Sequence, residues 1–518
     1  MAQRYLVMAE IVSRRSFLRT SALGSAGLCL TSRTKARSVG VARKPNLLVF
    51  LPDQQRPDTI GCYGGNPGIA PNLNALASQS FVFQNTYVTH PLCTPSRSSL
   101  LTGTWPHANG CTHNSVPLDH RLLCLPELID DRDYHFAYMG KWHLGDELSA
   151  QHGFTEWVSI MNGREPRLTT EGHPIVASDY DRFLVSKGFQ PDLAGRGVFS
   201  RSFGSKLPLD LSKPKFLESN ACSFLEQHRH DPFVLFVSFY EPHPPYNGPL
   251  NNEHPLNQVT LEPTADDHFD ANIPLRYRLR QEWDRSRYGR DPMRQLKIKQ
   301  RYLGLVSEVD HAVGKILTKL EQLGLADDTI VIHTSDHGDM MSAHGMFGKE
   351  VLFQEAVRVP YLVRLPNQRK MVKVQQPVSH IDFVPTVLDL LGKPPHQQCA
   401  GKSRAGLLRG EEMAAETVFV ERSPVRREKM KRHTRLASSD DIRRAAGEST
   451  RTAISPDGWK LCLRDRDKNE LYALQSDPGE RRNLYGDKNL REVMSRLTGE
   501  IHAWQEKNGD KVQLSLAV

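Results

Sequence analysis

The stretch Pro45-Asn46-Leu47-Leu48-Val49-Phe50-Leu51 is an apolar run that ends just before Asp53. Its apolar residues do not alternate with polar ones, which predicts a strand buried on both faces, as in a parallel sheet. Two similar runs, Phe233–Phe239 and Thr329–Thr334, end near His243 and Asp336. We therefore expect parallel strands whose carboxyl ends carry polar residues to one edge of a sheet.

The segment from about Gln300 to Leu323 predicts a helix between two of these strands. Its apolar side chains recur at helical spacing: Tyr302, Leu305, Val306, Val309, Val313, Ile316, Leu317 and Leu320. Strands that alternate with helices indicate an α/β fold, with a mostly parallel central sheet flanked by helices. Residues from about 150 to 225 look irregular, and we interpret them as an insertion over the active-site face.

The pattern of predicted elements changes after about residue 415. Short strands are expected at Glu416–Glu421, Trp459–Leu463 and Glu470–Leu474, the last two as a hairpin pair. An amphipathic helix is expected from about Leu490. These features predict a catalytic domain over residues 44–414 and a smaller antiparallel-sheet subdomain over residues 415–518.

The net charge of +8 is concentrated at the N-terminus, because residues 1–44 contain nine Lys or Arg and one acidic residue. The rest of the chain is close to neutral, so nucleic-acid binding is not expected. Ser13-Arg14-Arg15-Ser16-Phe17-Leu18-Arg19 precedes a short apolar stretch. This pattern predicts a twin-arginine export signal over residues 1–40, with the bacterial periplasm or the exterior as destination. No segment reads as a stable membrane span.

The eight cysteines carry no C-x-x-C motif, so a zinc knuckle has no support. Cys29 lies in the predicted signal, and Cys93 belongs to the motif discussed next. The other six could pair in an oxidising compartment, but their spacing does not choose a pairing.

The stretch Cys93-Thr94-Pro95-Ser96-Arg97-Ser98-Ser99-Leu100-Leu101-Thr102-Gly103 has a proline two residues and an arginine four residues after its cysteine. It resembles the signature of the type I sulfatases, in the alkaline phosphatase superfamily. The resemblance implies that a formylglycine-generating maturation enzyme oxidises Cys93 to Cα-formylglycine, whose hydrate is the nucleophile. It also implies an alkaline-phosphatase-like version of the α/β fold.

The resemblance to this family covers roughly residues 44 to 485, and further motifs of the family occur on both sides of Cys93, in the family's order. They are Pro52-Asp53-Gln54, Gly140-Lys141-Trp142-His143-Leu144-Gly145, Tyr240-Glu241-Pro242-His243-Pro244-Pro245-Tyr246, Thr334-Ser335-Asp336-His337-Gly338-Asp339 and His344-Gly345-Met346-Phe347-Gly348-Lys349. Taken singly, each acid, lysine or histidine is more often a loop, surface or core residue. Their ordered occurrence favours the functional interpretation.

The resemblance assigns a role to each candidate residue. Cys93, once modified, is the nucleophile and a metal ligand, and Arg97 stabilises its hydrate. Lys141 and His143 hold and deprotonate the hydrate, with His143 as the base for elimination. His243 and Lys349 bind the sulfate and protonate the leaving oxygen. The divalent cation is held by Asp53, Gln54, Asp336 and His337.

Two of these ligands depart from the commonest family pattern. Gln54 stands where the family usually has an acid, and His337 offers nitrogen. Similarity favours Ca²⁺, which prefers oxygen ligands, whereas a nitrogen ligand would also admit Mn²⁺ or another transition ion. The same Asp-Gln and Asp-His pattern occurs in the related phosphonate monoester hydrolases.

The function expected from these residues is an exported sulfatase acting on sulfate esters, with a sulfated carbohydrate as substrate. Cationic groups and a metal suit the negative charge that develops as the S–O bond breaks. A phosphonate monoester or phosphodiester hydrolase on the same fold is the first alternative. A two-zinc phosphatase using Thr94 is weaker, because no second histidine-rich metal site is apparent. A non-catalytic protein that binds sulfated glycans is a third alternative, against which the intact Cys93 and Arg97 argue.

Overall fold

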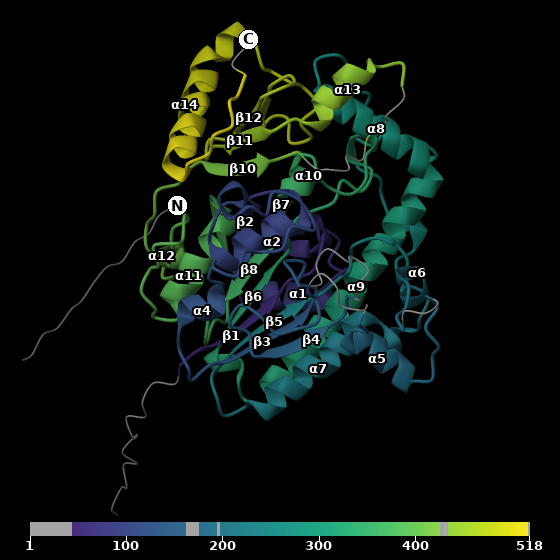
Figure 1. The fold of residues 1–518 in the computed structure, drawn as a ribbon, viewed down its shortest axis with the longest axis vertical. Helices are drawn as coiled ribbons and strands as arrows, with labels where there is room; N and C mark the ends of the chain where they lie inside the picture. The colour runs from purple at the N-terminus through teal and green to yellow at the C-terminus, as the bar shows by residue number, and fades with distance from the viewer. Residues whose placement is uncertain (1–43, 162–175, 194–196, 425–429, 431–433, 516–518) are drawn as a thin grey trace, which may run out of the picture. The chain divides into compact units, whose positions relative to one another are not determined.

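The computed structural model describes residues 44–161, 176–193, 197–424, 430 and 434–515. The predicted export signal lies outside the described residues. Arg43–Val518 forms one compact unit, and Figure 1 shows its central sheet with helices around it. The division predicted at residue 414 therefore falls inside a single compact unit, and it stays a prediction.

Within the described residues the central sheet has nine strands, in the order β4-β3-β5-β1-β6-β8-β2-β7, with β9 paired to β2. Their bounds are β1 Asn46–Phe50, β2 Phe81–Tyr87, β3 His135–Gly140, β4 Glu156–Ser159, β5 Phe233–Ser238, β6 Thr329–Thr334, β7 Arg358–Val359, β8 Tyr361–Arg364 and β9 Val372–Ser379. The α-helices of this part of the chain are α1 Pro71–Ala77, α2 Cys93–Thr102, α3 Pro106–Asn109, α4 Leu125–Ile129, α5 Asp179–Ser186, α6 Arg201–Gly204, α7 Lys213–Gln227, α8 Leu275–Tyr288, α9 Pro292–Gln322, α10 Gln354–Val357, α11 Phe383–Leu390 and α12 Ala405–Leu408.

The predicted mostly parallel sheet is confirmed. The three strands expected from the apolar runs are β1, β5 and β6, and they lie side by side. Leu47 of β1 pairs in parallel register with Val234 of β5 and with Ile330 of β6. Beyond β6 the pairing with β8 is antiparallel, which makes the sheet mixed.

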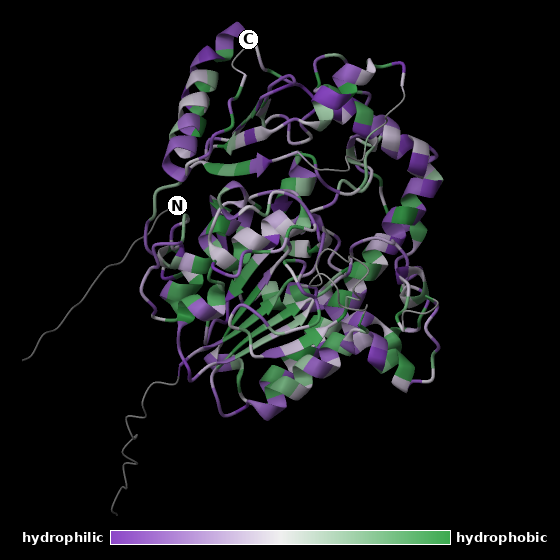
Figure 2. Cartoon of the chain, in the orientation of Figure 1, coloured by the Kyte–Doolittle hydropathy of each residue, from purple (hydrophilic) through white to green (hydrophobic). Residues whose placement is uncertain are grey.

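The sheet is buried on both faces, as the lack of alternation in β1 predicts. Leu48 and Phe50 belong to the core cluster that contains apolar residues of α1, α7 and α9. Leu47 and Val49 belong to the opposite cluster, with residues of α4 and α11. Figure 2 shows the central strands as predominantly hydrophobic, whereas the surrounding helices carry hydrophilic outer faces.

The prediction that residues 150–225 are irregular is wrong for much of that stretch. It contains β4, α5, α6 and the 15-residue helix α7. Ser212 caps α7 by accepting a hydrogen bond from the backbone of Lys215. The helix predicted from about Gln300 is α9, which begins earlier, at Pro292, after an Asp291 cap.

A second sheet of four antiparallel strands follows, in the order β10-β11-β12-β13. The remaining elements are β10 Val418–Arg422, α13 Ser439–Ala446, β11 Thr450–Ile454, β12 Trp459–Arg464, β13 Glu470–Ala473 and α14 Arg491–Asn508. The predicted hairpin is the pair β12 and β13. One face of this sheet packs on α14. The other face packs on Tyr87, Val88 and neighbouring apolar residues at the β2–β7 end of the central sheet.

Two further features concern cysteines and membrane spans. All seven cysteines of the described part of the chain are free. Among the described residues, no helix has both the length and the apolar composition needed to cross a bilayer.

Candidate active site

The predicted metal ligands lie at one edge of the central sheet, where the parallel strands end. Asp53 and Gln54 follow β1, and Asp336 and His337 follow β6. Because β1 and β6 are adjacent and parallel, their carboxyl ends share this edge. Cys93 is the first residue of α2 and completes the group.

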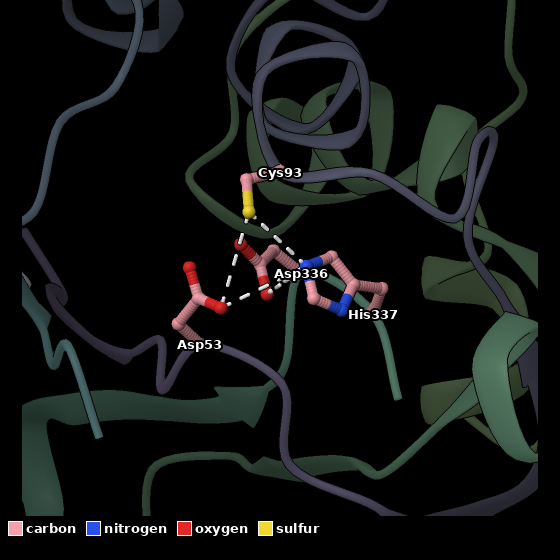
Figure 3. A group of neighbouring side chains, drawn as sticks. All are labelled: Asp53, Cys93, Asp336 and His337. Carbon is pink, nitrogen blue, oxygen red and sulfur yellow. Dashed lines mark hydrogen bonds and ion pairs between the residues drawn. The ribbon is translucent and has the colours of Figure 1, made fainter. Parts of the chain in front are cut away.

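Four fully buried side chains converge here, and Figure 3 shows them pointing toward one another. The ligand atoms of Asp53, Cys93, Asp336 and His337 all lie within 4.8 Å of one another. His337 Nε2 lies 3.2 Å from Cys93 Sγ and 3.5 Å from Asp336 Oδ1. His337 Nδ1 donates to the carbonyl oxygen of Gly338 at 2.9 Å, which turns Nε2 toward the cluster. Against the effect of burial, the Asp336 carboxylate raises the pKa of this imidazole.

This donor set fits a divalent cation. Burial and the Asp53 carboxylate raise the pKa of Asp336, because two buried carboxylates repel each other. A cation held by Asp53, Asp336 and His337 would relieve that repulsion.

The Gln54 side chain is held in one orientation beside this cluster. Its Nε2 donates to the Asp339 carboxylate and to the Tyr246 hydroxyl. Its Oε1 accepts from Lys349 Nζ at 2.9 Å. Because the carboxylate fixes the NH₂ end, the carbonyl oxygen faces the side of the site where Lys349 approaches Cys93.

Two lysines supply positive charge to the cluster. Lys141 forms an ion pair with Asp53, and Lys349 Nζ lies 2.9 Å from Cys93 Sγ. Burial favours the neutral acid at Asp53, but both ammonium groups outweigh it and hold the pKa of Asp53 well below its usual range. At Cys93, burial and Asp53 act to raise the pKa of the thiol, yet the lysines and His337 lower it well below its ordinary value. The site therefore favours negative charge on the side chain of residue 93.

Arg97 is fully buried and links the two carboxylates. Its Nε donates to Asp336 Oδ2 at 2.8 Å, and its Nη2 lies 3.5 Å from Asp53 Oδ2. Its Nη1 donates to the Lys141 carbonyl and to Ser238 Oγ, both at 2.8 Å. Arg97 thus holds the ends of β1, β3, β5 and β6 together from one position on α2.

His143 lies in a left-handed conformation, with φ of 61°, in the loop after β3. Its backbone N–H donates to Glu147 at 2.8 Å, and its carbonyl accepts from Thr94 Oγ1 at 2.8 Å. These bonds tie the loop to the residue after Cys93. The ring Nδ1 is buried with no hydrogen-bond partner among the described residues.

His243 lies in the loop after β5 and donates from Nδ1 to the Pro244 carbonyl at 2.8 Å. Burial and the Lys349 ammonium hold the pKa of His243 well below its usual range. Without substrate, the imidazole is therefore neutral and its Nε2 is unprotonated.

Sequence reasoning missed three residues that shape this site: Asp339, Ser238 and Tyr240. Asp339 was quoted within its motif but received no role, although its place three residues after Asp336 was a usable signal. Ser238 ends β5, so its position at the sheet edge was also readable. Tyr240 lies 5.5 Å from Lys141 Nζ, measured to the ring centroid, and no local pattern indicates that contact.

Comparison with known families covers most of the chain. The sulfatase family model matches residues 45–393. A model for the C-terminal part of N-sulphoglucosamine sulphohydrolase matches residues 342–507.

Individual relatives extend this result. The ulvan-active sulfatase of Formosa agariphila is 30% identical over 364 residues, which span 67% of this chain and 61% of that protein. The N-acetylglucosamine-6-O-sulfatase of Bacteroides thetaiotaomicron is 24% identical over 541 residues, covering 92% of this chain and 89% of that protein.

Among solved structures, the phosphonate monoester hydrolase of Agrobacterium radiobacter superposes with a TM-score of 0.68. It is 22% identical, and the match covers 90% of this chain and 96% of that structure. This likeness shows the fold, whereas the family model spans well over half of the sequence. The chain therefore belongs to the sulfatase family, the sulfuric ester hydrolases of the alkaline phosphatase superfamily.

Proposed function

We propose that this protein is an exported sulfatase that hydrolyses sulfate esters of a carbohydrate through a formylglycine formed at Cys93, with one divalent cation. The observation that carries the proposal is the position of Cys93. It opens α2, fully buried, with the potential cation ligands on one side and Lys349 2.9 Å from its sulfur. The N-acetylglucosamine-6-O-sulfatase among the relatives supports a carbohydrate as the alcohol part of the ester.

Cys93 Sγ marks the place that the hydroxyl oxygens of the hydrated formylglycine would take. One hydroxyl, already ionised because the site favours negative charge at this position, would form a bond to the sulfur of the ester while the S–O bond to the sugar breaks. The leaving oxygen needs a proton. Lys349 is protonated, because the charges of Cys93 and Asp53 outweigh the opposing effect of burial and raise its pKa. An anionic sulfate beside His243 would also raise the pKa of that imidazole, so bound substrate would make it a second donor.

Release of sulfate needs a base. We assign this role to His143, whose ring Nδ1 is buried and makes no hydrogen bond with any described residue. Loss of a proton from the remaining hydroxyl lets the C–O bond to the sulfate break and re-forms the aldehyde, which then takes up water.

The residues Asp53, Gln54, Asp336 and His337 would hold the cation. When bound, it would supply positive charge to the nonbridging oxygens of the sulfate. Similarity supports Ca²⁺, and the nitrogen of His337 leaves Mn²⁺ as the other candidate.

A phosphonate monoester hydrolase remains the second candidate, because Gln54 and His337 fit the Asp-Gln and Asp-His pattern of those enzymes. The fold is also similar to that of such a hydrolase, with a TM-score of 0.68. The test uses protein produced together with a formylglycine-generating enzyme. We expect hydrolysis of an aryl sulfate to exceed that of the matching aryl phosphonate. A phosphonate rate far above the sulfate rate would overturn the sulfatase assignment.

The matched variants are Cys93→Ala and Cys222→Ala. The first removes the residue to be modified, and the second removes a half-buried free cysteine on α7. Only Cys93→Ala should abolish turnover, by at least a thousandfold. Mass spectrometry of the Cys93 peptide should show the aldehyde, and an unmodified thiol in the native host would favour a non-catalytic binding protein.

Export rests on the twin-arginine pattern in residues 1–40. Because that route carries folded proteins, we propose that the maturation enzyme oxidises Cys93 before export. Cell fractionation followed by mass spectrometry tests the order. Formylglycine found only in exported protein, and not in the cytoplasmic precursor, would reverse it.

A further inference from the structure

A small cavity of about 50 Å³ adjoins the active site and includes His243 in its wall. The other residues that matter here are Arg201 of α6, Lys213 at the start of α7, Tyr240 and Glu241 after β5, and Glu308 of α9. A cavity of this size holds a few waters or one small polar group, and it is too small for a sugar ring.

Two cations on this wall, Arg201 and Lys213, approach the same aromatic ring. Arg201 Cζ lies 5.0 Å and Lys213 Nζ 4.8 Å from the centroid of the Tyr240 ring. Neither side chain makes a hydrogen bond or an ion pair with any described residue. Lys141 approaches the same ring but is paired with Asp53. Burial lowers the pKa of Lys213 against the attraction of Glu241, which forms no ion pair with it. Partly buried cations whose close contact is an aromatic face are incompletely compensated, so they favour an added anion.

Among the described residues, the acids of the cavity form no ion pair with either cation. Glu308 is 3% exposed, and its Oε1 has no hydrogen-bond partner among the described residues. Burial and Glu241 raise the pKa of Glu308 to about 9, so it is neutral at pH 7. Burial also raises the pKa of Glu241, against the attraction of Lys213.

Asp181 lines the cavity as well, but its oxygens are already engaged. Oδ1 accepts from the backbone of Phe199, and Oδ2 accepts from Ser178. Besides His243 Nε2, the charged or acidic side chains left with free hydrogen-bonding capacity are therefore Arg201, Lys213, Glu241 and Glu308, of which Glu308 is uncharged at pH 7.

We infer that this cavity is a subsite for a second anionic group of the substrate, a carboxylate or a second sulfate, bound by Arg201 and Lys213. Charge-assisted hydrogen bonds from a guanidinium and an ammonium suit either group. His243 lines the cavity and also belongs to the catalytic site, so one substrate molecule can reach both. The inference rests on the proposed function and narrows its substrate to esters with two or more anionic groups.

The test uses pairs of aryl sulfates that share one leaving group. One member carries a carboxylate or second sulfate on a short arm, and the other carries the methyl ester or free hydroxyl. The measured quantity is the ratio of kcat/KM within each pair, for wild type, Lys213→Gln, Arg201→Gln and the control Lys206→Gln. Lys206 is an exposed lysine outside the cavity.

We expect wild type to prefer the anionic member of at least one pair by about tenfold, and each cavity variant to remove most of that preference through KM. Lys206→Gln should retain it. The pair that shows the preference distinguishes carboxylate from sulfate. No preference in any pair, or an equal loss on both members, would overturn the inference.

A failure of the proposed sulfatase function would give a different result from a failure of the subsite inference. In that case wild-type protein carrying formylglycine hydrolyses none of the aryl sulfates. Thermal unfolding of each variant checks that it folds, and the two cavity variants lie on separate helices, so a folding defect in one leaves the other decisive.

Discussion

Asp339 binds the Gln54 side chain, so we expect the predicted metal site to depend on it. Its carboxylate accepts four hydrogen bonds from described residues: Oδ1 accepts from the backbones of Met341 and Gly348 at 2.8 and 2.9 Å, and Oδ2 accepts from Tyr246 and Gln54. Asp339→Asn would place an NH₂ group against donors. We expect the Gln54 amide to lose its orientation and the affinity for Ca²⁺ or Mn²⁺ to fall about 10- to 100-fold.

Calorimetric titration of the metal measures this change. The control is Asp327→Asn, at an exposed carboxylate that pairs with Arg369. Equal affinities in wild type and Asp339→Asn would show that Gln54 is not a ligand held by Asp339.

Arg97 allows a prediction about stability. Arg97→Met would leave the Asp53 and Asp336 carboxylates buried without their guanidinium partner. Breaking a buried ion pair in this way costs about 3–5 kcal/mol. Urea unfolding in chelator should show that loss, and added divalent cation should recover part of it by taking up the charge.

The matched control is Arg182→Met, because Arg182 makes an exposed ion pair with Asp179 on α5. Such pairs contribute about 0–1 kcal/mol. Comparable losses in the two variants would contradict the view that Arg97 organises the site.

The residues of helix α2 were singled out by the motif that begins at Cys93 and not by a helical periodicity, which their sequence lacks. All ten residues of α2 are buried. A helix enclosed on every side has no apolar stripe, so its sequence gives no helical pattern. Two of its hydroxyls donate to carbonyl oxygens of the helix, Ser98 to Pro95 at 2.7 Å and Thr102 to Ser98 at 2.6 Å, whereas Ser96 and Ser99 Oγ have no hydrogen-bond partner among the described residues.

Helix α9 carries a pH prediction through Glu308. Burial raises the folded-state pKa of this residue to about 9, whereas the unfolded value is about 4.3. Between those values the folded state holds a proton that the unfolded state releases, so stability falls as pH rises. Glu308→Gln removes this titrating group and with it the pH dependence that it gives to the free energy of unfolding. Its free energy of unfolding relative to wild type should rise by roughly 2–4 kcal/mol from pH 5 to pH 8.

Urea unfolding at the two pH values measures this difference, with Glu321→Gln as the control on the exposed end of α9. A relative stability of Glu308→Gln that does not change with pH would mean that Glu308 is ionised in the folded protein.

At the scale of the whole molecule, the small sheet is part of the fold and not an appendage. Val418, Val420, Ile454 and Cys462 pack against apolar residues at the β2–β7 end of the central sheet. Lys460 reaches across to the Leu352 carbonyl and pairs with Glu480.

A fragment of residues 44–414 should therefore expose this apolar surface and fail to fold as a stable monomer. Size-exclusion chromatography and dye binding test this, with residues 44–518 as the control. A monomeric fragment with the thermal stability of the longer chain would support the boundary predicted at residue 414.

Much of the fold was readable because it depends on local pattern. Non-alternating apolar runs predicted β1, β5 and β6, and helical spacing predicted α9, since burial on both faces or on one stripe leaves a mark in the sequence. The stretch around α7 was misjudged. Its core-facing residues Leu217, Ala221, Phe224 and Leu225 recur at helical spacing, so the helix could have been predicted from the sequence.

The sequence by itself determined the parallel core strands, the ordered motifs and the identity of the candidate reacting residue, because these depend on residue type and spacing along the chain. Only the tertiary structure decided which side chains come within bonding distance. It placed Arg97 between two carboxylates and the Gln54 amide within hydrogen-bonding distance of Asp339. It also brought Arg201 and Lys213 to the ring of Tyr240. Such contacts join residues far apart in sequence, and their geometry exists only once the strands and helices have packed.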